Sequence, residues 1–144
     1  MPLEANQYLR LIMSTSQRID NLGYYHLLKP LKLSVASYQI LRVLEKYQAL
    51  SPSELVKQLG STKSNISQRL HSLEKRGLIH RTIDPNDHRS TRLELSPSGQ
   101  QLLSGIAEKI QHAEIQLEKH FSPEELHNLQ SFLHKLNTIF DNCH

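Results

Sequence analysis

The sequence contains little cysteine, glycine or proline and no long apolar run, and these shortages exclude several classes of protein. The single cysteine among 144 residues, Cys143, rules out an internal disulfide framework and a cysteine-based structural zinc site. Five glycines and six prolines, together with 38% apolar residues, are typical of one ordered domain rather than of a disordered tail. No apolar run approaches the ~20 residues that cross a bilayer, so we expect no membrane partner. The first residues lack the layout of a signal peptide, so we expect a cytoplasmic protein.

The positive charge of the chain is concentrated in one window. The whole chain carries a formal net charge of +3, whereas residues 61–92 hold seven Lys or Arg and three Asp or Glu, a net charge of +4. The other residues together therefore carry −1. Three histidines lie in the same window: His71, His80 and His88. A basic window of this kind favours a polyanion as the partner.

The first half of the chain shows the signals of four helices. Helical spacing of apolar residues predicts a helix from Glu4 to about Leu28 and a second helix that Ser34 begins. Ser51-Pro52-Ser53-Glu54 is a capping box that starts a short helix, which Gly60 ends. A fourth helix starts after Thr62 or Ser61 and reaches Gly77.

The second half begins with a change of period. Residues 78–83 and 91–95 alternate like strands on either side of the turn cluster at residues 84–87, which predicts a hairpin. Ser96-Pro97 then caps a helix that continues to about His120. A last helix starts at Ser122-Pro123-Glu124-Glu125, again with a capping box.

The helix that follows Thr62 has two different faces. At 100° per residue, Ile66, Leu70 and Leu73 lie on one side. The other side is polar and is made of Ser64, Gln68, His71 and Lys75, flanked by Asn65 and Ser67. Such a face is a candidate for reading a DNA groove, and the alternative is an ordinary solvated surface.

The order of these elements predicts a mainly α-helical winged helix-turn-helix fold with a small β-hairpin wing. We expect a single domain over residues 1–144, in which residues 34–96 form the DNA-binding lobe. The flanking helices, within residues 1–33 and 97–144, are too apolar on one side for so small a lobe to cover. They are therefore expected to be dimerisation helices of a homodimer.

Two stretches resemble the MarR family of bacterial transcription regulators, named for multiple antibiotic resistance. Leu73-Glu74-Lys75-Arg76-Gly77-Leu78-Ile79-His80-Arg81 is similar to the family's Leu-Glu-x-x-Gly-Leu-Ile/Val-x-Arg turn. Residues 84–99 (DPNDHRSTRLELSPSG) are similar to its wing pattern, in which Asp and Arg precede alternating leucines, a helix cap and a glycine. Ser96 stands where the family usually has Thr, and both residues cap helices. The strict motif covers about 27 residues, and the order of the elements extends the resemblance over nearly the whole chain.

The resemblance implies a homodimeric, sequence-specific regulator that binds double-stranded DNA. Each protomer would place one recognition helix in a major groove and one wing in a neighbouring minor groove of a pseudo-palindromic operator. We expect a repressor that a small-molecule effector releases from inverted-repeat operators. The alternative is a winged-helix protein-interaction module that does not bind DNA. An enzyme is not expected, because no phosphate-binding glycine loop, HExxH or GxSxG motif is present.

The resemblance and the chemistry of the side chains assign expected roles in DNA binding. The family's wing Arg is matched by Arg89, whose guanidinium would enter the narrow minor groove. Asp87 matches the wing Asp and is expected to orient Arg89 or Arg81 through charge-assisted hydrogen bonds, although a solvated turn ion pair is the alternative. Bases are expected to meet the recognition-helix residues Ser64, Asn65, Ser67, Gln68 and His71. Phosphates are expected to meet Lys63, Arg69, His88, and Ser51 and Ser53 at a helix N-terminus.

Other candidate sites are weaker. In the family, effectors bind between the dimerisation helices and the DNA-binding lobe, and here the candidate lining residues are Tyr24, Tyr25, His26 and Tyr38, whose alternative role is packing. No cofactor is expected. His112, His120, His127 and His134 are spaced too far apart for one metal ion, so no metal site is expected. Cys143 has no neighbour that would activate its thiol, and Arg76 is expected only to balance the dipole at its helix end.

Overall fold

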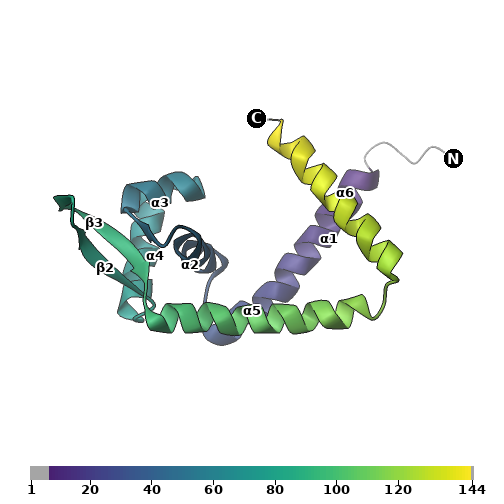
Figure 1. Cartoon of the computed structure of the whole chain (residues 1–144), viewed down its shortest axis with the longest axis horizontal. Helices are drawn as coiled ribbons and strands as arrows, with labels where there is room; N and C mark the ends of the chain where they lie inside the picture. Colours follow the sequence, from purple (N-terminus) through teal and green to yellow (C-terminus); the bar gives the residue numbers. More distant parts are fainter. Residues whose placement is uncertain (1–6, 144) are drawn as a thin grey trace. The chain divides into compact units, whose positions relative to one another are not determined.

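The computed structural model describes residues 7–143, which fold into helices and one small sheet (Figure 1). The part of the predicted first helix before residue 7 lies outside the described residues. Contacts divide the chain into two compact units, one up to Ile106 and one from Ala107 onwards. The first unit carries every predicted DNA-binding residue.

The N-terminal helix changes its winding before it ends. The α1 helix covers Gln7–Gly23, a π-helical turn follows at Tyr24–Leu28, and a 3₁₀ turn covers Lys29–Leu31. The predicted end near Leu28 is therefore confirmed, with the π-helical turn as its last part. Lys32 then adopts a left-handed conformation with φ of 52°, which is uncommon for a residue that has a side chain. Pro30 lies within the short 3₁₀ turn, where a missing N–H is tolerated.

The three helices of the lobe begin at the predicted caps. The α2 helix (Val35–Tyr47) starts after Ser34, whose hydroxyl accepts a hydrogen bond from the N–H of Ser37. The α3 helix (Pro52–Leu59) starts with the complete capping box of Ser51 and Glu54. It ends at Gly60, whose φ of 58° suits glycine. The α4 helix (Lys63–Lys75) starts after Thr62, which settles the choice between Thr62 and Ser61.

A three-stranded antiparallel sheet follows the helices, in the order β1-β3-β2. The strands are β1 (Ala49–Leu50), β2 (Ile79–Asp84) and β3 (Asp87–Leu95). The predicted hairpin is confirmed, but β3 begins four residues earlier than the predicted strand, and β1 was not predicted. The pairing runs from Ile79 with Leu95 to Ile83 with Thr91 and then shifts, so that Asp84 pairs with Asp87. The shift leaves residues 88–90 as extra residues on β3, near the tip.

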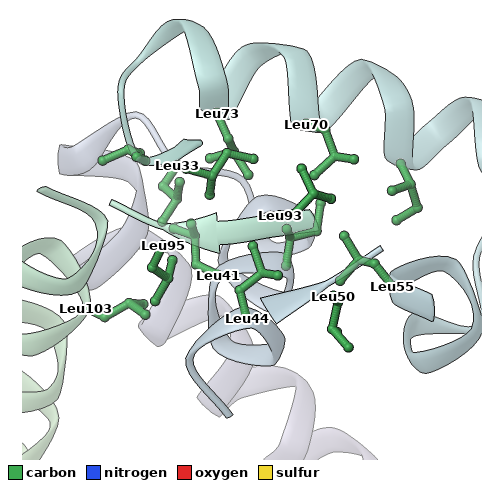
Figure 2. Close-up of a cluster of buried hydrophobic side chains, with 14 of the residues drawn as sticks. Leu33, Leu41, Leu44, Leu50, Leu55, Leu70, Leu73, Leu93, Leu95 and Leu103 are labelled. Carbon is green, nitrogen blue, oxygen red and sulfur yellow. The ribbon is translucent and has the colours of Figure 1, made fainter. Parts of the chain in front are cut away.

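The core of the lobe is formed almost wholly by leucine and isoleucine, and Figure 2 shows leucines from α2, α3, α4 and β3 meeting in it. The predicted apolar face of α4 points into this core, with Ile66 4%, Leu70 1% and Leu73 1% exposed. Leu93, on β3, is fully buried. Burying the apolar stripe of α4 here leaves its opposite face exposed to solvent.

The base of the wing and the start of α5 (Pro97–Glu118) are joined by close contacts. The Ser96 hydroxyl accepts a hydrogen bond from the N–H of Gly99 at 3.0 Å and donates one to the carbonyl of Gly77 at 2.5 Å. A Cβ on Gly99 would lie 2.1 Å from the carbonyl oxygen of Leu78. The glycine of the wing pattern is therefore required by a close backbone approach.

The second unit contains the rest of α5 and α6 (Pro123–Asp141), which starts with the predicted capping box of Ser122 and Glu125. Large apolar side chains of α6 are exposed, with Phe132 65% and Leu133 52% exposed. In the first unit, α1 also exposes apolar side chains and has no buried residue. Each unit therefore carries apolar helix surface that is open to solvent in the single chain.

Candidate nucleic-acid interface

The outer face of α4 is a polar surface of small and hydrogen-bonding side chains. All five residues predicted to meet bases are exposed: Ser64, Asn65, Ser67, Gln68 and His71. Lys63 at the start of the helix is also exposed. Since Ile66 and Leu70 hold the other face in the core, the orientation of this polar surface is fixed. The two faces predicted from helical spacing are therefore confirmed, whereas the contacts of the outer face with bases stay predictions.

At the N-terminus of α3, the capping box already uses part of the predicted phosphate site. The backbone N–H of Ser51 donates to the carboxylate of Glu54 at 2.8 Å, and the N–H of Glu54 donates to the Ser51 hydroxyl at 3.2 Å. The hydrogen bond from the backbone N–H of Ser51, with a smaller contribution from the charge of Arg92, lowers the pKa of the Glu54 carboxyl below its ordinary value. The N–H of Ser51 is thus occupied by an anion of the chain itself, while Ser53 is exposed beside it.

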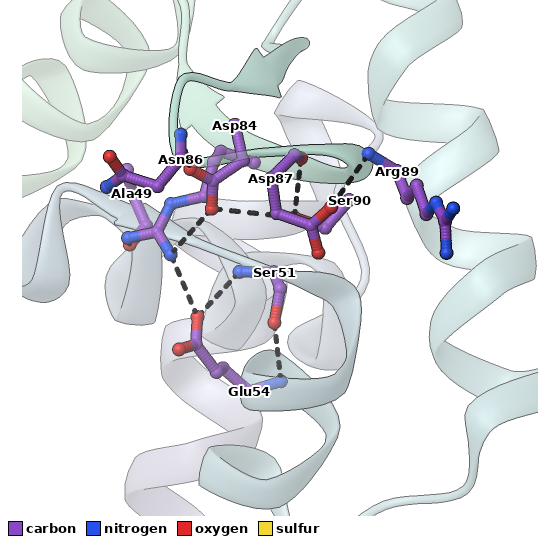
Figure 3. Close-up of polar contacts among 9 residues, drawn as sticks. Ala49, Ser51, Glu54, Asp84, Asn86, Asp87, Arg89 and Ser90 are labelled. Carbon is purple, nitrogen blue, oxygen red and sulfur yellow. Dashed lines mark hydrogen bonds and ion pairs between the residues drawn. The ribbon is translucent and has the colours of Figure 1, made fainter.

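The tip of the wing is held by hydrogen bonds that the carboxylates of two aspartates accept (Figure 3). The carboxylate of Asp84 accepts from the N–H of Asn86 at 2.9 Å and from the hydroxyl of Ser90 at 3.4 Å. The carboxylate of Asp87 accepts from the backbone N–H of Arg89 at 3.0 Å. Turns of this kind are typical of aspartate, whose short side chain reaches the backbone two residues on.

Asp87 forms a charge-assisted hydrogen bond with Arg89, as expected, but the donor is the backbone N–H of Arg89 and not a guanidinium. The backbone is the donor because the Asx turn places the carboxylate of Asp87 beside the N–H two residues later. The Nε of Arg81 donates to the carboxylate of Glu74 on α4 at 2.6 Å, which ties β2 to the end of that helix. Arg89 and His88 are exposed on the extra residues of β3. The guanidinium of Arg89 makes no hydrogen bond or ion pair with any residue between 7 and 143, so its charge is available to a partner.

Arg92 connects the wing to the helix-turn-helix, a role that sequence reasoning missed. Its guanidinium lies 3.6 Å from the carboxylate of Glu54 and 3.9 Å from that of Asp84, and it donates to the carbonyl of Ala49 at 3.2 Å. Figure 3 shows these acceptors converging from α3, β1 and the wing. The sequence offered one signal for this role. Arg92 is a charged residue in an alternating strand, and it directly precedes Leu93, which faces the core.

Arg69 on α4 and Arg76, which caps the end of that helix, contact the segment that leads into α2. Nη1 of Arg69 donates to the Ser34 hydroxyl at 3.3 Å. The two terminal nitrogens of Arg76 donate to the carbonyls of Lys32 and Leu31 at 2.9 and 2.8 Å. Arg76 was expected only to balance the dipole of its own helix. That expectation is wrong, because its guanidinium binds the free carbonyls at the end of the 3₁₀ turn that precedes α2.

The candidate effector-lining residues lie in the π-helical turn and in α2. The rings of Tyr24 and Tyr25 meet edge to face at 5.4 Å, and the ammonium of Lys29 lies 5.0 Å from the centre of the Tyr25 ring. Tyr24 and Tyr38 are half-buried and pack against the core, whereas Tyr25 and His26 are exposed. Packing accounts for Tyr24 and Tyr38, and a role for these residues in binding an effector stays a prediction.

The part of the chain from residue 7 to residue 143 contains no group of three His, Cys, Asp or Glu arranged to hold a metal ion. Within the same residues, no helix has the length and apolar character of a membrane span. Cys143 is exposed, and its thiol donates to the carbonyl of Ile139 at 3.2 Å.

Three helices, a hairpin and a polar recognition face together define a winged helix-turn-helix protein. The model of the MarR family matches residues 33–91. The chain is 31% identical to the HTH-type transcriptional regulator PecS of Dickeya dadantii over 71% of this chain and 63% of PecS. It is 30% identical to the transcriptional repressor MprA of Escherichia coli over 80% of this chain and 66% of MprA. The matched region thus spans slightly less than two thirds of each of these relatives.

The solved structure of wild-type MarR from E. coli in its apo form superposes with a TM-score of 0.76 and 26% identity, covering 88% of this chain and 93% of that chain. The residues that carry the resemblance in sequence form the turn after α4 and the wing in this structure. Residues 33–91 therefore match the MarR family, and the likeness in fold to wild-type MarR extends over 88% of the chain.

Proposed function

We propose that the protein is a homodimeric, sequence-specific DNA-binding transcription regulator that represses inverted-repeat operators and is released from them by a small molecule. The observation that carries this proposal is the pairing of an exposed polar face on α4 with an exposed, uncommitted Arg89 on the wing. The names of the relatives, a transcriptional regulator and a transcriptional repressor, support the same function. The protein is a regulator and not an enzyme, and it acts in the cytoplasm, where bacterial DNA lies.

The dimensions of α4 suit the major groove of DNA. A helix with its side chains is about 10–12 Å in diameter and the groove is about 12 Å wide, so the 13 residues of α4 can lie in it with their outer face toward the base edges. Gln68 and Asn65 carry amides that pair bidentately with adenine, and the hydroxyls of Ser64 and Ser67 bond to bases or phosphates. Lys63 at the helix start contacts phosphate and fixes the register.

Arg89 reads the neighbouring minor groove. A narrow minor groove has an enhanced negative potential that attracts an inserted guanidinium. The extra residues on β3 carry Arg89 beyond the regular ladder, and Asp87 fixes its backbone without neutralising its charge. His88 beside it contacts phosphate.

A second copy of the chain covers the exposed apolar helices. Residues 1–33 and 97–144 form the dimerisation region, and residues 34–96 form the DNA-binding lobe. Exposed side chains such as Ile19 of α1 (63%) and Phe132 of α6 (65%) would otherwise leave apolar surface in water. A two-fold dimer places two α4 helices about one DNA turn apart, roughly 34 Å, which requires an inverted repeat.

The effector acts on the same arrangement. A small molecule bound among Tyr24, Tyr25, His26 and Tyr38 would lie where the N-terminal helix leads into the lobe. Binding there changes the spacing of the two reading helices and lowers the affinity for the operator, because only one spacing matches both half-sites.

Selection of bound duplexes from a random pool tests the proposal. The full chain should enrich an inverted repeat whose half-sites are separated by about 10 base pairs, centre to centre. A pool that shows no enrichment, with no retention of duplex even at low salt, would favour the alternative of a winged-helix module that binds protein.

Arg89→Ala tests the role of the wing on the selected operator. It should weaken the operator and random duplex alike and reduce the slope of log affinity against log salt by about one unit. Arg42→Ala is the matched control, because Arg42 lies on α2 and is already paired with Glu45. An unchanged slope for Arg89→Ala would remove the wing from the DNA-facing surface.

A further inference from the structure

Ile83, on the wing, is a large apolar side chain that the lobe leaves in solvent. Among the exposed large apolar residues within 34–96 it has the highest exposed fraction, 65%, against 47% for Val35 and 41% for Tyr47. The dimer proposed above covers apolar side chains of α1 and α6, so it does not account for this one. An apolar side chain at the end of an otherwise polar wing therefore needs another explanation.

The pairing of the hairpin shows to which side Ile83 points. Side chains an even number of residues apart on a strand share one face, so Ile83 lies on the face of Ile79, which is 3% exposed and belongs to the core. Its partner on β3 is Thr91, which shares a face with the buried Leu93 for the same reason. Ile83 thus continues the core-facing side of the sheet, its inner face, beyond the end of the core.

The α4 helix packs on this inner face. Its buried leucines belong to the same core as Ile79, and its Glu74 accepts a hydrogen bond from Arg81, the inner-face residue that precedes Ile83. Two residues of a strand advance about 7 Å, so Ile83 lies one step past this contact, toward the tip of the wing. The outer face of α4 and the side chain of Ile83 therefore point in the same direction, away from the strands.

A duplex that lies on the outer face of α4 consequently lies on the side of the wing that carries Ile83. One sugar–phosphate strand separates a major groove from the neighbouring minor groove. With α4 in the first groove and Arg89 in the second, this strand must cross the inner face of the wing between them. Ile83 lies on that face, between the contact of Arg81 with α4 and the tip residues 88–90.

The surroundings of Ile83 favour DNA over an apolar partner. His88 and Arg89 are exposed at the tip, and residues 61–92 carry a net charge of +4. A DNA backbone offers phosphates to these cations and the C–H groups of deoxyribose to an isoleucine. Ile83 also forms the last regular pair of the hairpin before the shift in register, so its position is fixed by the ladder.

We propose that Ile83 packs against the deoxyribose rings of the backbone strand that runs between α4 and the wing. The contact excludes water from apolar surface and displaces no counterion, so it adds affinity for any duplex without adding to the salt dependence. It differs in this way from Arg89 and His88, which act through charge. This inference rests on the proposed function, because it needs a duplex on the outer face of α4.

The first test compares Ile83→Thr with the wild-type full chain on the selected operator and on random duplex. Threonine keeps the β-branched shape that suits a strand and replaces apolar surface by a hydroxyl. Loss of the contact should weaken binding to both duplexes about tenfold. The slope of log affinity against log salt should stay at the wild-type value, whereas Arg89→Ala reduces it by about one unit.

Thr82→Ala is the matched control, because Thr82 is the neighbouring residue of β2 and points to the opposite face of the sheet. It lowers the strand propensity and leaves the inner face unchanged, so it should bind both duplexes like the wild type. Equal losses in Thr82→Ala and Ile83→Thr would assign the effect to the strand and overturn the proposal. A loss by Ile83→Thr that is confined to the operator would place Ile83 against a base and overturn it as well.

The second test locates the contact by hydroxyl-radical cleavage of the operator, since the radical attacks exposed C–H groups of deoxyribose. The wild type should protect the sugars between the groove of α4 and that of the wing. Ile83→Thr, at a concentration that saturates the operator, should restore cleavage at these sugars alone. Unchanged affinity and an unchanged footprint would overturn this inference and leave the proposed function standing. A wild type that retains no duplex even at low salt would overturn the proposed function and this inference with it.

Discussion

Two glycines in α5 provide a direct test of how the wing is attached to that helix. A Cβ added to Gly99 would lie 2.1 Å from the carbonyl oxygen of Leu78, whereas one added to Gly105 would meet nothing within 4 Å. Real Cβ contacts essentially never fall under 3.0 Å, so Gly99→Ala requires a displacement of about 0.9 Å between two backbone segments. The same carbonyl accepts a hydrogen bond from the N–H of Ser96, which limits how far it can move.

The two substitutions should therefore change stability in opposite directions. Overpacking costs about 1–3 kcal/mol, and weakening the hydrogen bond to Ser96 costs about 1 kcal/mol more, against a helix gain from alanine of up to about 1 kcal/mol. We expect Gly99→Ala to lower the free energy of unfolding by about 1–3 kcal/mol. Gly105→Ala gains helix propensity without a clash and should raise it by about 0.5–1 kcal/mol.

Urea denaturation at equilibrium measures both free energies, and affinity for the selected operator gives a second readout. Gly99→Ala should also weaken operator binding, because Leu78 joins the end of α4 to the first residue of β2. Gly105→Ala should bind like the wild type. Equal stability of the two variants would refute the close backbone approach and with it the explanation of the glycine in the wing pattern.

Three further predictions concern the interface and its support. Asp87→Ala should weaken operator binding. Asp87→Asn keeps an acceptor for the N–H of Arg89 and should bind the operator at least as well as the wild type. Weaker operator binding by Asp87→Asn would restore the ion-pair interpretation. Gln68→Ala should cost about 1–3 kcal/mol on the cognate operator alone, and an equal loss on random duplex would assign Gln68 to the DNA backbone. Because the pKa of Glu54 is lowered in the folded chain, ionised Glu54 stabilises the fold above its ordinary value of 4.5, and this contribution is lost as the pH falls through the folded pKa. Glu54→Gln should thus destabilise near neutral pH and approach the wild type well below pH 4.5 in urea titrations, and a constant difference across pH would contradict this.

Local signals were sufficient to predict most of the helix boundaries. Ser34, Ser51, Thr62 and Ser122 cap helices as predicted, because capping depends on residues within one turn. The apolar face of α4 followed from the spacing of its leucines for the same reason. The exposed position of Arg89 also agreed with the motif, because a hairpin tip has few neighbours.

Contacts between segments far apart in sequence were the ones that could not be predicted. Arg76 binds carbonyls more than forty residues away, and Arg92 lies near a carboxylate in α3 and another in the wing. β1 has only two residues, too few to show alternation, and exists because β3 offers an edge. For Asp87 the sequence indicated a hydrogen bond that orients Arg89 or Arg81, but not that the turn would make the backbone N–H of Arg89 the donor.

The shift in pairing near the end of the hairpin separates the pairing register of β2 and β3 from the length of the wing tip. All regular pairs from Ile79 with Leu95 to Ile83 with Thr91 lie on the core side of the shift, and together with the pairing of Leu50 in β1 they hold Leu93 and Leu95 in place. A slip of one residue in that ladder would turn both leucines outward. Residues 88–90 lie beyond it, and their number can change without any such slip. The arm that carries Arg89 can therefore lengthen or shorten while the ladder that packs on the core stays unchanged.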